Sequence, residues 1–372
     1  MEDVVIVGGG PSGAYLGYCL AREGICATIF DHSHPREKPC AGGLSALALK
    51  RYPFLNRTPG PRCIDPRVRI VSPSGNEATV GTGYTGYTIK ISRLRLDKFL
   101  LDMAINSGAK LVEEKVMDVD SQDGIWHVRT EHRTTRARLI VGADGVSSLV
   151  RRKVMQPHTR ENLGLGFGYL ARGLEEDMAM MQFLKNRKGY IWVYPRGDHT
   201  CIGIGSEITS SQGLRQELDR FIKEQHFDIT IMSSFAALIP SATDPRFFKL
   251  PCTGQNWVLV GDAAGHVDPI SGEGITYALW SAELAAKSMA EGNHREFDAL
   301  WRKEYGHDLV TAARFRRLLY NPRLLDLSVS AARKSNTFSK LLHDVIVNDW
   351  GSRTVLGRMI RDLPKTIVES VS

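Results

Sequence analysis

The sequence has few cysteines, and no two of them are closely spaced. Six cysteines stand in 372 residues, at positions 19, 26, 40, 63, 201 and 252, and no two form a C-x-x-C pair. Closely spaced cysteines are typical of zinc sites, iron–sulfur clusters and small disulfide frameworks. We therefore predict no metal site and no fold that depends on disulfides.

Long apolar runs and export signals are also missing. No segment approaches the roughly 18 consecutive apolar residues that a membrane-spanning helix needs. The chain passes from Met1-Glu2-Asp3 directly into "VVIVGGG", without the basic segment and cleavage site of a signal peptide. The composition, 42% apolar and 24% charged, is that of a globular protein. We expect a cytoplasmic location.

Positive charge is in excess, and most of the excess lies near the C-terminus. The net charge is +7, and residues 307–372 hold eleven Lys and Arg against six Asp and Glu, a difference of +5. Such a segment can meet nucleic acid, an anionic membrane or an acidic partner. Because no nucleic-acid-binding motif accompanies it, we predict no nucleic-acid partner. A solvated basic face and a peripheral membrane contact both stay open.

Glycine is abundant, with 35 residues, and its first cluster has a recognisable spacing. In "VVIVGGGPSGAYLGYCLAREG", Gly8, Gly10 and Gly13 fit G-x-G-x-x-G between a strand and a helix. These glycines permit a tight turn, approach of a pyrophosphate and close helix–strand packing. The next strand, "ATIF", ends at Asp31, 18 residues after Gly13, near the spacing of a carboxylate that binds ribose. The pattern predicts a dinucleotide-binding unit.

Two distant segments repeat the scheme of an apolar strand followed by a carboxylate and glycines. They are "LIVGADGVSSLVRRKV" (139–154), with Asp144, and "NWVLVGDAAGHVDPISGEGITYALWSAELAA" (256–286), with Asp262. A strand that ends in this way places its carboxylate at the edge of a sheet where cofactors bind. Each segment alone is compatible with an ordinary turn, but the three together favour FAD.

With these motifs in place, the sequence resembles the p-hydroxybenzoate hydroxylase-type flavoproteins, and among them the geranylgeranyl reductase family. The matching stretches are "PREKPCAGGL" (35–44), "YIWVYP" (190–195) and "GDAAGHVDPISGEGI" (261–275). Ala41 departs from the pattern, since many members have Gly there. The resemblance implies FAD as cofactor and saturation of C=C bonds in prenyl (geranylgeranyl) chains, with hydride from N5 of the reduced flavin.

The resemblance also implies which positions contact the cofactor. They include Gly8, Gly10, Gly13 and Asp31. At the adenine–phosphate end, the resemblance implies Ser12 at the pyrophosphate, Val116 at the adenine and Arg93 from a helix start. At the flavin end, it implies Asp262 near the ribityl phosphate, Cys40, Ala41 and Gly43 at the flavin edge, and Gly274 and Ile275 facing the isoalloxazine. The positive end of the helix near Gly274 would favour a reduced, anionic flavin.

The order of the signals predicts an α/β fold with interleaved domains. A Rossmann-type FAD-binding domain is expected from residues 1–61, 93–161 and 251–296. An α+β substrate domain with an antiparallel sheet is expected from 62–92 and 162–250, followed by a C-terminal helical region at 297–372. In "YIWVYP", alternation places Tyr190, Trp192 and Tyr194 on one face. That row can form the wall of a prenyl pocket or the plain core of a sheet.

Reducing an isolated double bond requires an apolar groove and a proton donor. Cys40 and His266 are the candidate donors, and Asp268 lies in the same loop as His266. Alternatively, either residue supports the structure of its loop and takes no part in proton transfer. Two other functions stay open: an FAD-dependent monooxygenase or halogenase of the same fold, and a prenyl-binding module without catalysis. The substrate is expected to be a prenylated small molecule or lipid.

The external electron donor is left open by the sequence. NADPH is one candidate, although no second complete G-x-G-x-x-G unit follows the first. A reductant protein such as a ferredoxin, meeting the basic surface, is the other candidate.

Overall fold

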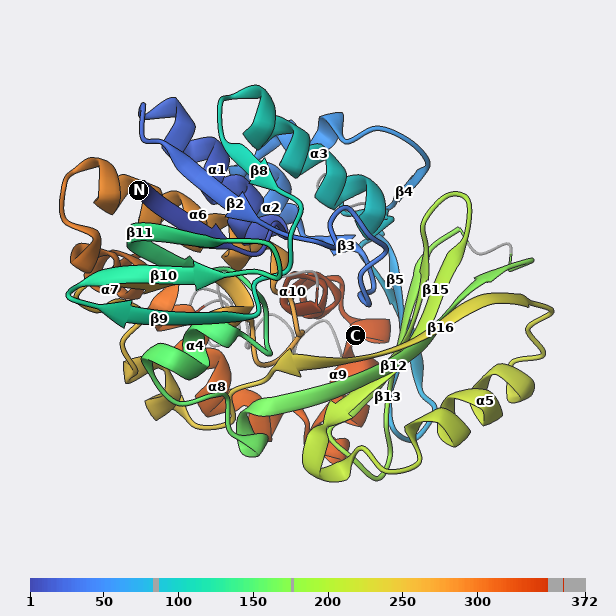
Figure 1. The fold of residues 1–372 in the computed structure, drawn as a ribbon. Helices are drawn as coiled ribbons and strands as arrows, with labels where there is room; N and C mark the ends of the chain where they lie inside the picture. Colours follow the sequence, from blue (N-terminus) through green and yellow to red (C-terminus); the bar gives the residue numbers. More distant parts are fainter. Residues whose placement is uncertain (83–86, 175–176, 347–356, 358–372) are drawn as a thin grey trace.

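The computed structural model describes residues 1–82, 87–174, 177–346 and 357. Figure 1 shows one sheet with its helices on one side of the molecule and the long strands of a second sheet on the other. The predicted fold class is confirmed: a mixed α/β fold with a parallel-rich sheet, a mostly antiparallel second sheet and C-terminal helices.

The first sheet joins the three segments that the glycine motifs singled out. Its order in the described chain is β8 (Lys110–Val112), β2 (Ala27–Phe30), β1 (Glu2–Val7), β11 (Thr134–Gly142), β10 (Ile125–Arg129) and β9 (Asp118–Gln122), and β17 (Trp257–Leu259) also pairs with β11. Strands β8, β2, β1, β11 and β17 are parallel. Val7 pairs with Gly142, and Gly142 with Leu259. The three motifs therefore begin side by side at one sheet edge.

Three helices pack together beside this sheet (Figure 1). They are α1 (Pro11–Arg22), α3 (Arg93–Asn106) and α6 (Ile275–Ala290), and α1 contacts both of the others. The shorter helices α2 (Ala46–Arg51) and α4 (Leu149–Val154) lie after the loops that leave the sheet. The apolar residues of β1, β2, β11 and α6 form the main core.

The second sheet has a different helix over each face. Its order among the described residues is β16 (Thr230–Pro240), β12 (Leu163–Arg172), β15 (Thr200–Glu207), β14 (Gly189–Pro195), β13 (Ala179–Phe183), β5 (Val68–Val71) and β6 (Glu77–Val80). Ile191 and Val193 share a core cluster with Leu218 of α5 (Leu214–Glu224). Tyr190 and Tyr194 pack on the opposite cluster, which includes α9 (Pro322–Lys334). The structure thus has the alternation expected of "YIWVYP".

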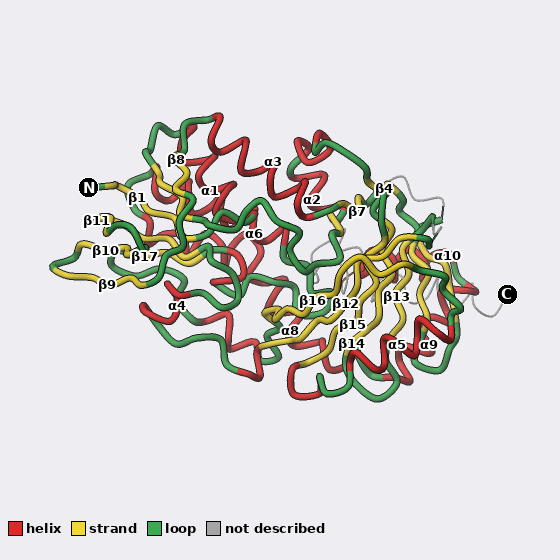
Figure 2. The backbone as a smooth tube through the Cα atoms, turned by 45° about the vertical axis from the view of Figure 1, so that its right-hand side comes forward, coloured by secondary structure: helices red, strands yellow, loops and turns green. Residues whose placement is uncertain are grey.

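A small sheet of β3 (Gly43–Leu44), β7 (Ile89–Ile91) and β4 (Arg62–Ile64) lies where the chain passes between the large sheets. The C-terminal helices are α7 (Phe297–Trp301), α8 (His307–Leu319), α9 and α10 (Asn336–Ile346). Figure 2 shows α5 and α9 running along the second sheet.

The predicted helical region, 297–372, is helical in its described part as far as Ile346, and most of the rest lies outside the described residues. No helix in the described ranges has the length and apolar character needed to cross a membrane. The three domain boundaries stay a prediction.

Candidate active site

A cavity of about 530 Å³ runs from the turn between β1 and α1 to the aromatic row of β14. It brings together every predicted cofactor and substrate residue except Gly13. Its lining includes Gly8, Gly10, Ser12, Asp31, Cys40, Ala41, Gly43, Arg93, Val116, Tyr190, Trp192, Tyr194, Asp262, Gly274 and Ile275. Residues far apart in the sequence therefore share one site.

The glycine turn at one end of the cavity fits a dinucleotide. Gly8 has φ +104°, and a Cβ there would lie 2.4 Å from the carbonyl oxygen of Ala143. A Cβ on Gly13 would lie 1.8 Å from the carbonyl oxygen of Gly8, so Gly13 supports the turn from behind. Gly10 stands at the N-cap of α1 without a capping side chain. The N–H groups of the first helical turn are therefore available to phosphates.

Asp31 holds the neighbouring loop as well as lining the cavity. One carboxylate oxygen accepts hydrogen bonds from the Gly9 amide (2.6 Å) and His34 Nδ1 (2.8 Å), and the other accepts from the amides of Ser33 (2.6 Å) and His34 (2.7 Å). Burial alone would raise the pKa of Asp31, but these hydrogen bonds hold it well below its usual range. Its predicted contact with ribose stays a prediction.

Asp144 is an acceptor that the sequence analysis identified only as part of a motif. Its Oδ2 accepts from the Leu149 amide at 2.6 Å. Its Oδ1 has no hydrogen-bond partner within the described part of the chain, although the residue lines the cavity. Burial raises the pKa of Asp144. A buried oxygen of this kind fits the hydroxyl groups of FAD.

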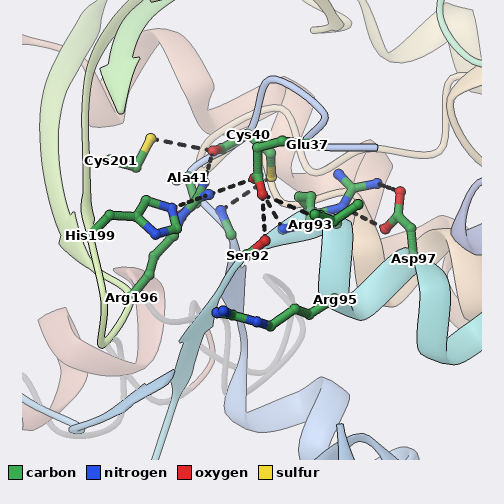
Figure 3. A network of polar contacts seen from close by, with 12 residues as sticks. Glu37, Cys40, Ala41, Ser92, Arg93, Arg95, Asp97, Arg196, His199 and Cys201 are labelled. Atoms are coloured by element: carbon green, nitrogen blue, oxygen red, sulfur yellow. Dashed lines mark hydrogen bonds and ion pairs between the residues drawn. The ribbon is translucent and has the colours of Figure 1, made fainter. Parts of the chain in front are cut away.

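The loop that carries Cys40 is held from the second sheet by Arg196 (Figure 3). Arg196 follows β14 directly and its side chain is fully buried. It donates to the carbonyl oxygens of Ala41 (3.1 Å) and Cys40, and to the Glu37 carboxylate at 2.7 Å. The thiol of Cys201 also donates to the Cys40 carbonyl, at 3.3 Å. The backbone position of Cys40 is therefore fixed by side chains from β15 and from the end of β14 in the second sheet.

Glu37 connects the same loop to α3. Its carboxylate accepts from the Ser92 hydroxyl and from the Arg93 amide (3.1 Å) at the first turn of the helix. Burial alone would raise the pKa of Glu37, but Arg196 and Ser92 lower it. Arg93 then pairs with Asp97 through two contacts of 2.8 Å. Figure 3 shows these groups converging on one loop.

Two different contacts explain why Gly42 and Gly43, which follow Cys40, have no side chain. Gly42 has φ +77°, and a Cβ there would lie 2.2 Å from the Ile91 carbonyl oxygen and 2.9 Å from Arg196 Nε. Contact within the protein therefore requires glycine at this position. A Cβ on Gly43 would meet the ring of Tyr194 at 3.2 Å. The half-buried thiol of Cys40 accepts from the Gly42 amide at 3.3 Å and lies at the cavity.

His266, the other candidate proton donor, is not brought to the cavity. It is 1% exposed, its Nδ1 lies 2.9 Å from the Tyr305 hydroxyl, and its ring centroid lies 4.4 Å from that of Trp301. Burial lowers the pKa of His266 to about 3, so the ring is neutral. Asp268 accepts from the amides of Ile270 and Ser271 and supports their turn. Both residues shape the loop from behind.

The start of α6 carries a negative side chain that the sequence interpretation did not include. Gly274 and Ile275 line the cavity as expected. However, the carboxylate of Glu273 accepts from the amide (2.8 Å) and hydroxyl (2.9 Å) of Thr276. This negative charge offsets the positive helix end that was expected to favour a reduced flavin. Asp262, opposite, lies 3.5 Å from the Lys38 ammonium.

The aromatic row closes the other end of the cavity. The Tyr190 hydroxyl donates to the Ser271 carbonyl oxygen at 2.5 Å, which ties β14 to the loop before α6. The Trp192 indole donates to the Cys201 thiol at 3.4 Å. Burial raises the pKa of Tyr194 to about 12, so its hydroxyl is neutral. The row is both a cavity wall and part of the sheet core.

Sequence reasoning missed Glu37, Arg196 and Cys201 as parts of the site. Glu37 and Arg196 stand within or beside the matched stretches "PREKPCAGGL" and "YIWVYP", and this position was the available signal. Their pairing across 159 positions of sequence follows only from the three-dimensional fold.

A protein-family model described as "FAD dependent oxidoreductase" (DAO) matches residues 39–288. The chain belongs to the FAD dependent oxidoreductase family. FAD is its cofactor, as predicted, and the cavity between the glycine turn, Asp144 and the Cys40 loop has residues that fit it.

Known relatives agree with the predicted resemblance to geranylgeranyl reductases, which is confirmed. A menaquinone reductase from Mycolicibacterium smegmatis is 28% identical over 389 residues, covering 94% of each chain. A digeranylgeranylglycerophospholipid reductase from Methanococcus vannielii is 26% identical over 347 residues, covering 85% of this chain and 86% of the relative. A solved geranylgeranyl bacteriochlorophyll reductase-like protein from Thermoplasma acidophilum shares the fold (TM-score 0.80, 21% identity, 99% and 98% coverage).

Proposed function

We propose that this FAD-dependent oxidoreductase saturates C=C bonds in the prenyl chain of an isoprenoid or lipid substrate. The observation that carries the proposal is the single cavity lined at one end by the glycine turn and at the other by Tyr190, Trp192 and Tyr194. An apolar chain gains about 0.8 kcal/mol for each buried CH2 group. A prenyl chain can therefore bind along aromatic and aliphatic walls without polar contacts over its length.

The relatives support this substrate class. One is named for menaquinone and another for a digeranylgeranyl glycerophospholipid, and both compounds carry long isoprenoid chains. The chain covers most of the length of both relatives, including the substrate sheet, so the comparison extends to the part that would hold the prenyl group.

When bound and reduced, FAD supplies a hydride to carbon. The residues of the chain have three tasks around it. The walls of β14 exclude water from the double bond, and Arg196 with Glu37 fixes the loop that presents Cys40. The thiol of Cys40 holds the proton that the second carbon requires, because it is the candidate donor that lies at the cavity. The donor of electrons to the flavin, NADPH or a ferredoxin, stays a prediction.

Access from a membrane surface is part of the proposal, because prenylated lipids reside there. At the junction of α8 and α9, the side chains of Leu318 (53% exposed), Leu324 (38%) and Leu327 (65%) face solvent next to Arg317 and Arg323. Exposed leucines beside arginines fit an anionic lipid surface. The basic tail, for which the sequence leaves a membrane contact and a solvated face open, lies partly outside the described residues, and a cytoplasmic location stays a prediction.

An anaerobic mixing experiment tests the function. The purified holoprotein is reduced with dithionite, mixed with geranylgeranyl diphosphate, menaquinone or a digeranylgeranyl glycerophospholipid, and followed by flavin absorbance. We expect at least one of these substrates to reoxidise the flavin without oxygen. A flavin that is reoxidised only by oxygen, with oxygen inserted into an aromatic compound, would instead identify a monooxygenase.

A further inference from the structure

Lys90 is a buried amine in the wall of the cavity. It lies at the centre of β7, is 2% exposed and lines the cavity. In the small sheet it stands directly opposite Gly43 of β3 and Cys63 of β4. Directly opposed residues of antiparallel strands project to the same face. Lys90 therefore shares the face on which Gly43 meets the ring of Tyr194.

The charge of Lys90 lacks a carboxylate partner in the described parts of the chain. An ammonium group has three donors, and Lys90 uses one of them for the carbonyl oxygen of Asp65 at 2.6 Å. The Asp65 carboxylate itself is bound by Arg67, with contacts of 2.7 and 3.1 Å. Burial lowers the pKa of Lys90 to about 8. A buried cation without a counter-ion is costly, and an anionic ligand relieves that cost.

Part of the cavity wall is apolar. Val68, Met181 and Ile346 line the same cavity and belong to one core cluster with Tyr194, whose ring faces Gly43. Thr88 lies two positions before Lys90. The hydroxyl of Thr88 donates to the Asp65 carbonyl oxygen at 2.8 Å, so it is already engaged. A ligand that lies along these aliphatic side chains and reaches Lys90 would end at a compact positive charge. This combination matches a molecule with an apolar chain and an anionic end.

We propose that Lys90 binds a phosphate oxygen at the polar end of a prenyl substrate. This inference rests on the proposed function and specifies its substrate class: phosphorylated prenyl compounds rather than neutral ones. The phosphate can belong to a free prenyl diphosphate or to a glycerophospholipid. A lysine ammonium is a suitable group for either, because it recognises charge with little demand on geometry.

Two variants separate this role from a structural one. Lys90→Met removes the charge and the hydrogen bond to Asp65. Lys90→Gln removes the charge but keeps an N–H donor, on a shorter side chain. If Lys90 only supports the turn at Asp65, neither variant lowers the affinity for phosphorylated ligands more than the affinity for a neutral prenyl ligand. If Lys90 binds phosphate, both variants lose affinity for the phosphorylated ligands alone. Lys223→Gln on α5, an exposed position on the other side of the second sheet, is the matched control.

The test measures dissociation constants of the oxidised holoprotein by flavin fluorescence. The ligands are geranylgeranyl diphosphate, a digeranylgeranyl glycerophospholipid and geranylgeraniol. We expect both Lys90 variants to lose roughly 10- to 100-fold in affinity for the phosphorylated ligands, with geranylgeraniol unchanged. The phosphorylated ligand that shows the loss identifies the source of the phosphate. Bound-FAD absorbance checks that each variant is folded.

The remaining outcomes are decisive in different ways. Equal losses for the phosphorylated ligands and geranylgeraniol, or no loss at all, would overturn the assignment of Lys90 while leaving the proposed function intact. Wild-type protein that binds menaquinone tightly but none of the phosphorylated ligands would also overturn the assignment of Lys90 and leave the proposed function intact. Failure of the wild type to bind any prenyl ligand would refute the proposed function, and the assignment of Lys90 with it.

Discussion

Cys40 is the side chain on which the proposed proton transfer depends. Its thiol lies at the cavity, while His266 is enclosed by Tyr305 and Trp301. The sequence presented these two residues as equivalent candidates, because both stand in loops of the matched motifs. Only their burial separates them, and burial of a single histidine in a loop depends on helices such as α7 that lie far along the chain.

We expect Cys40→Ala to retain FAD and to lose prenyl reduction by about 100-fold or more, since general acids typically contribute 100- to 10,000-fold. The measurement combines bound-flavin absorbance with single-turnover reoxidation of the reduced flavin. Cys26→Ala, which changes an exposed cysteine, is the control. Full turnover in Cys40→Ala would reduce Cys40 to a packing role and require another proton source.

Some residues of the site were predictable from the sequence immediately around them. The positions of Gly8, Gly13 and Asp31 follow from the geometry of one strand–turn–helix unit, and spacing alone predicts them. Arg196 was not predictable in this way. Its partners Glu37 and Cys40 lie in the loop between β2 and β3, and no periodicity in "YIWVYPRGD" indicates a contact with a loop more than 150 positions earlier.

Among the elements, the connection between β14 and α3 through the Cys40 loop is the most consequential. Arg196, at the end of β14, binds Glu37, and Glu37 binds the first turn of α3. The end of β14, the Cys40 loop and the first turn of α3 are therefore held together by these two side chains. This arrangement makes Arg196 a positioning residue, since it contacts the loop backbone instead of the reacting atoms.

We expect Arg196→Met to lower the free energy of unfolding by about 2–4 kcal/mol, because a buried charged group with several hydrogen bonds is lost. Urea denaturation measures this loss. The variant should also react faster with iodoacetamide at Cys40, since the loop is released. Arg196→Lys should restore only part of the effect, because one ammonium cannot replace the planar fork of arginine.

The control for this variant is Arg95→Met. Arg95 pairs with Asp198 at 2.8 Å, but the side chains are 30% and 37% exposed. Such a pair contributes less than about 1 kcal/mol. Similar losses in the two variants, or an unchanged alkylation rate at Cys40 in Arg196→Met, would contradict the positioning role.

The elements themselves were largely foreseeable, whereas their electrostatics were not. The alternation in "YIWVYP" and the glycine spacing correctly indicated the strand β14 and the turn before α1. The helix start at Gly274 was also expected, but Glu273 caps it. A preceding Glu is compatible with either a capping or a solvent-facing side chain, so the sequence could not settle its effect on the helix dipole.

For the whole molecule, the exposed leucines at the junction of α8 and α9 provide a test of membrane contact. We expect binding to vesicles of phosphatidylglycerol to exceed binding to phosphatidylcholine vesicles. Leu327→Glu should weaken it at least about 10-fold, because a 65% exposed leucine is the apolar contact that is removed. Co-sedimentation measures the bound fraction. Ile105→Glu, at a 40% exposed position on α3, serves as the control. Equal effects of the two substitutions would argue against a membrane surface at α9.

At the scale of the whole molecule, the glycine turn and the aromatic row share one cavity, and we propose that a prenyl chain meets the flavin there. The most direct measurement is the mass of the prenyl product after the reduced holoprotein has reacted without oxygen. We expect a gain of two hydrogen atoms for each double bond reduced, matched to the amount of flavin reoxidised. A prenyl substrate of unchanged mass, or one that has gained oxygen when air is admitted, would contradict it.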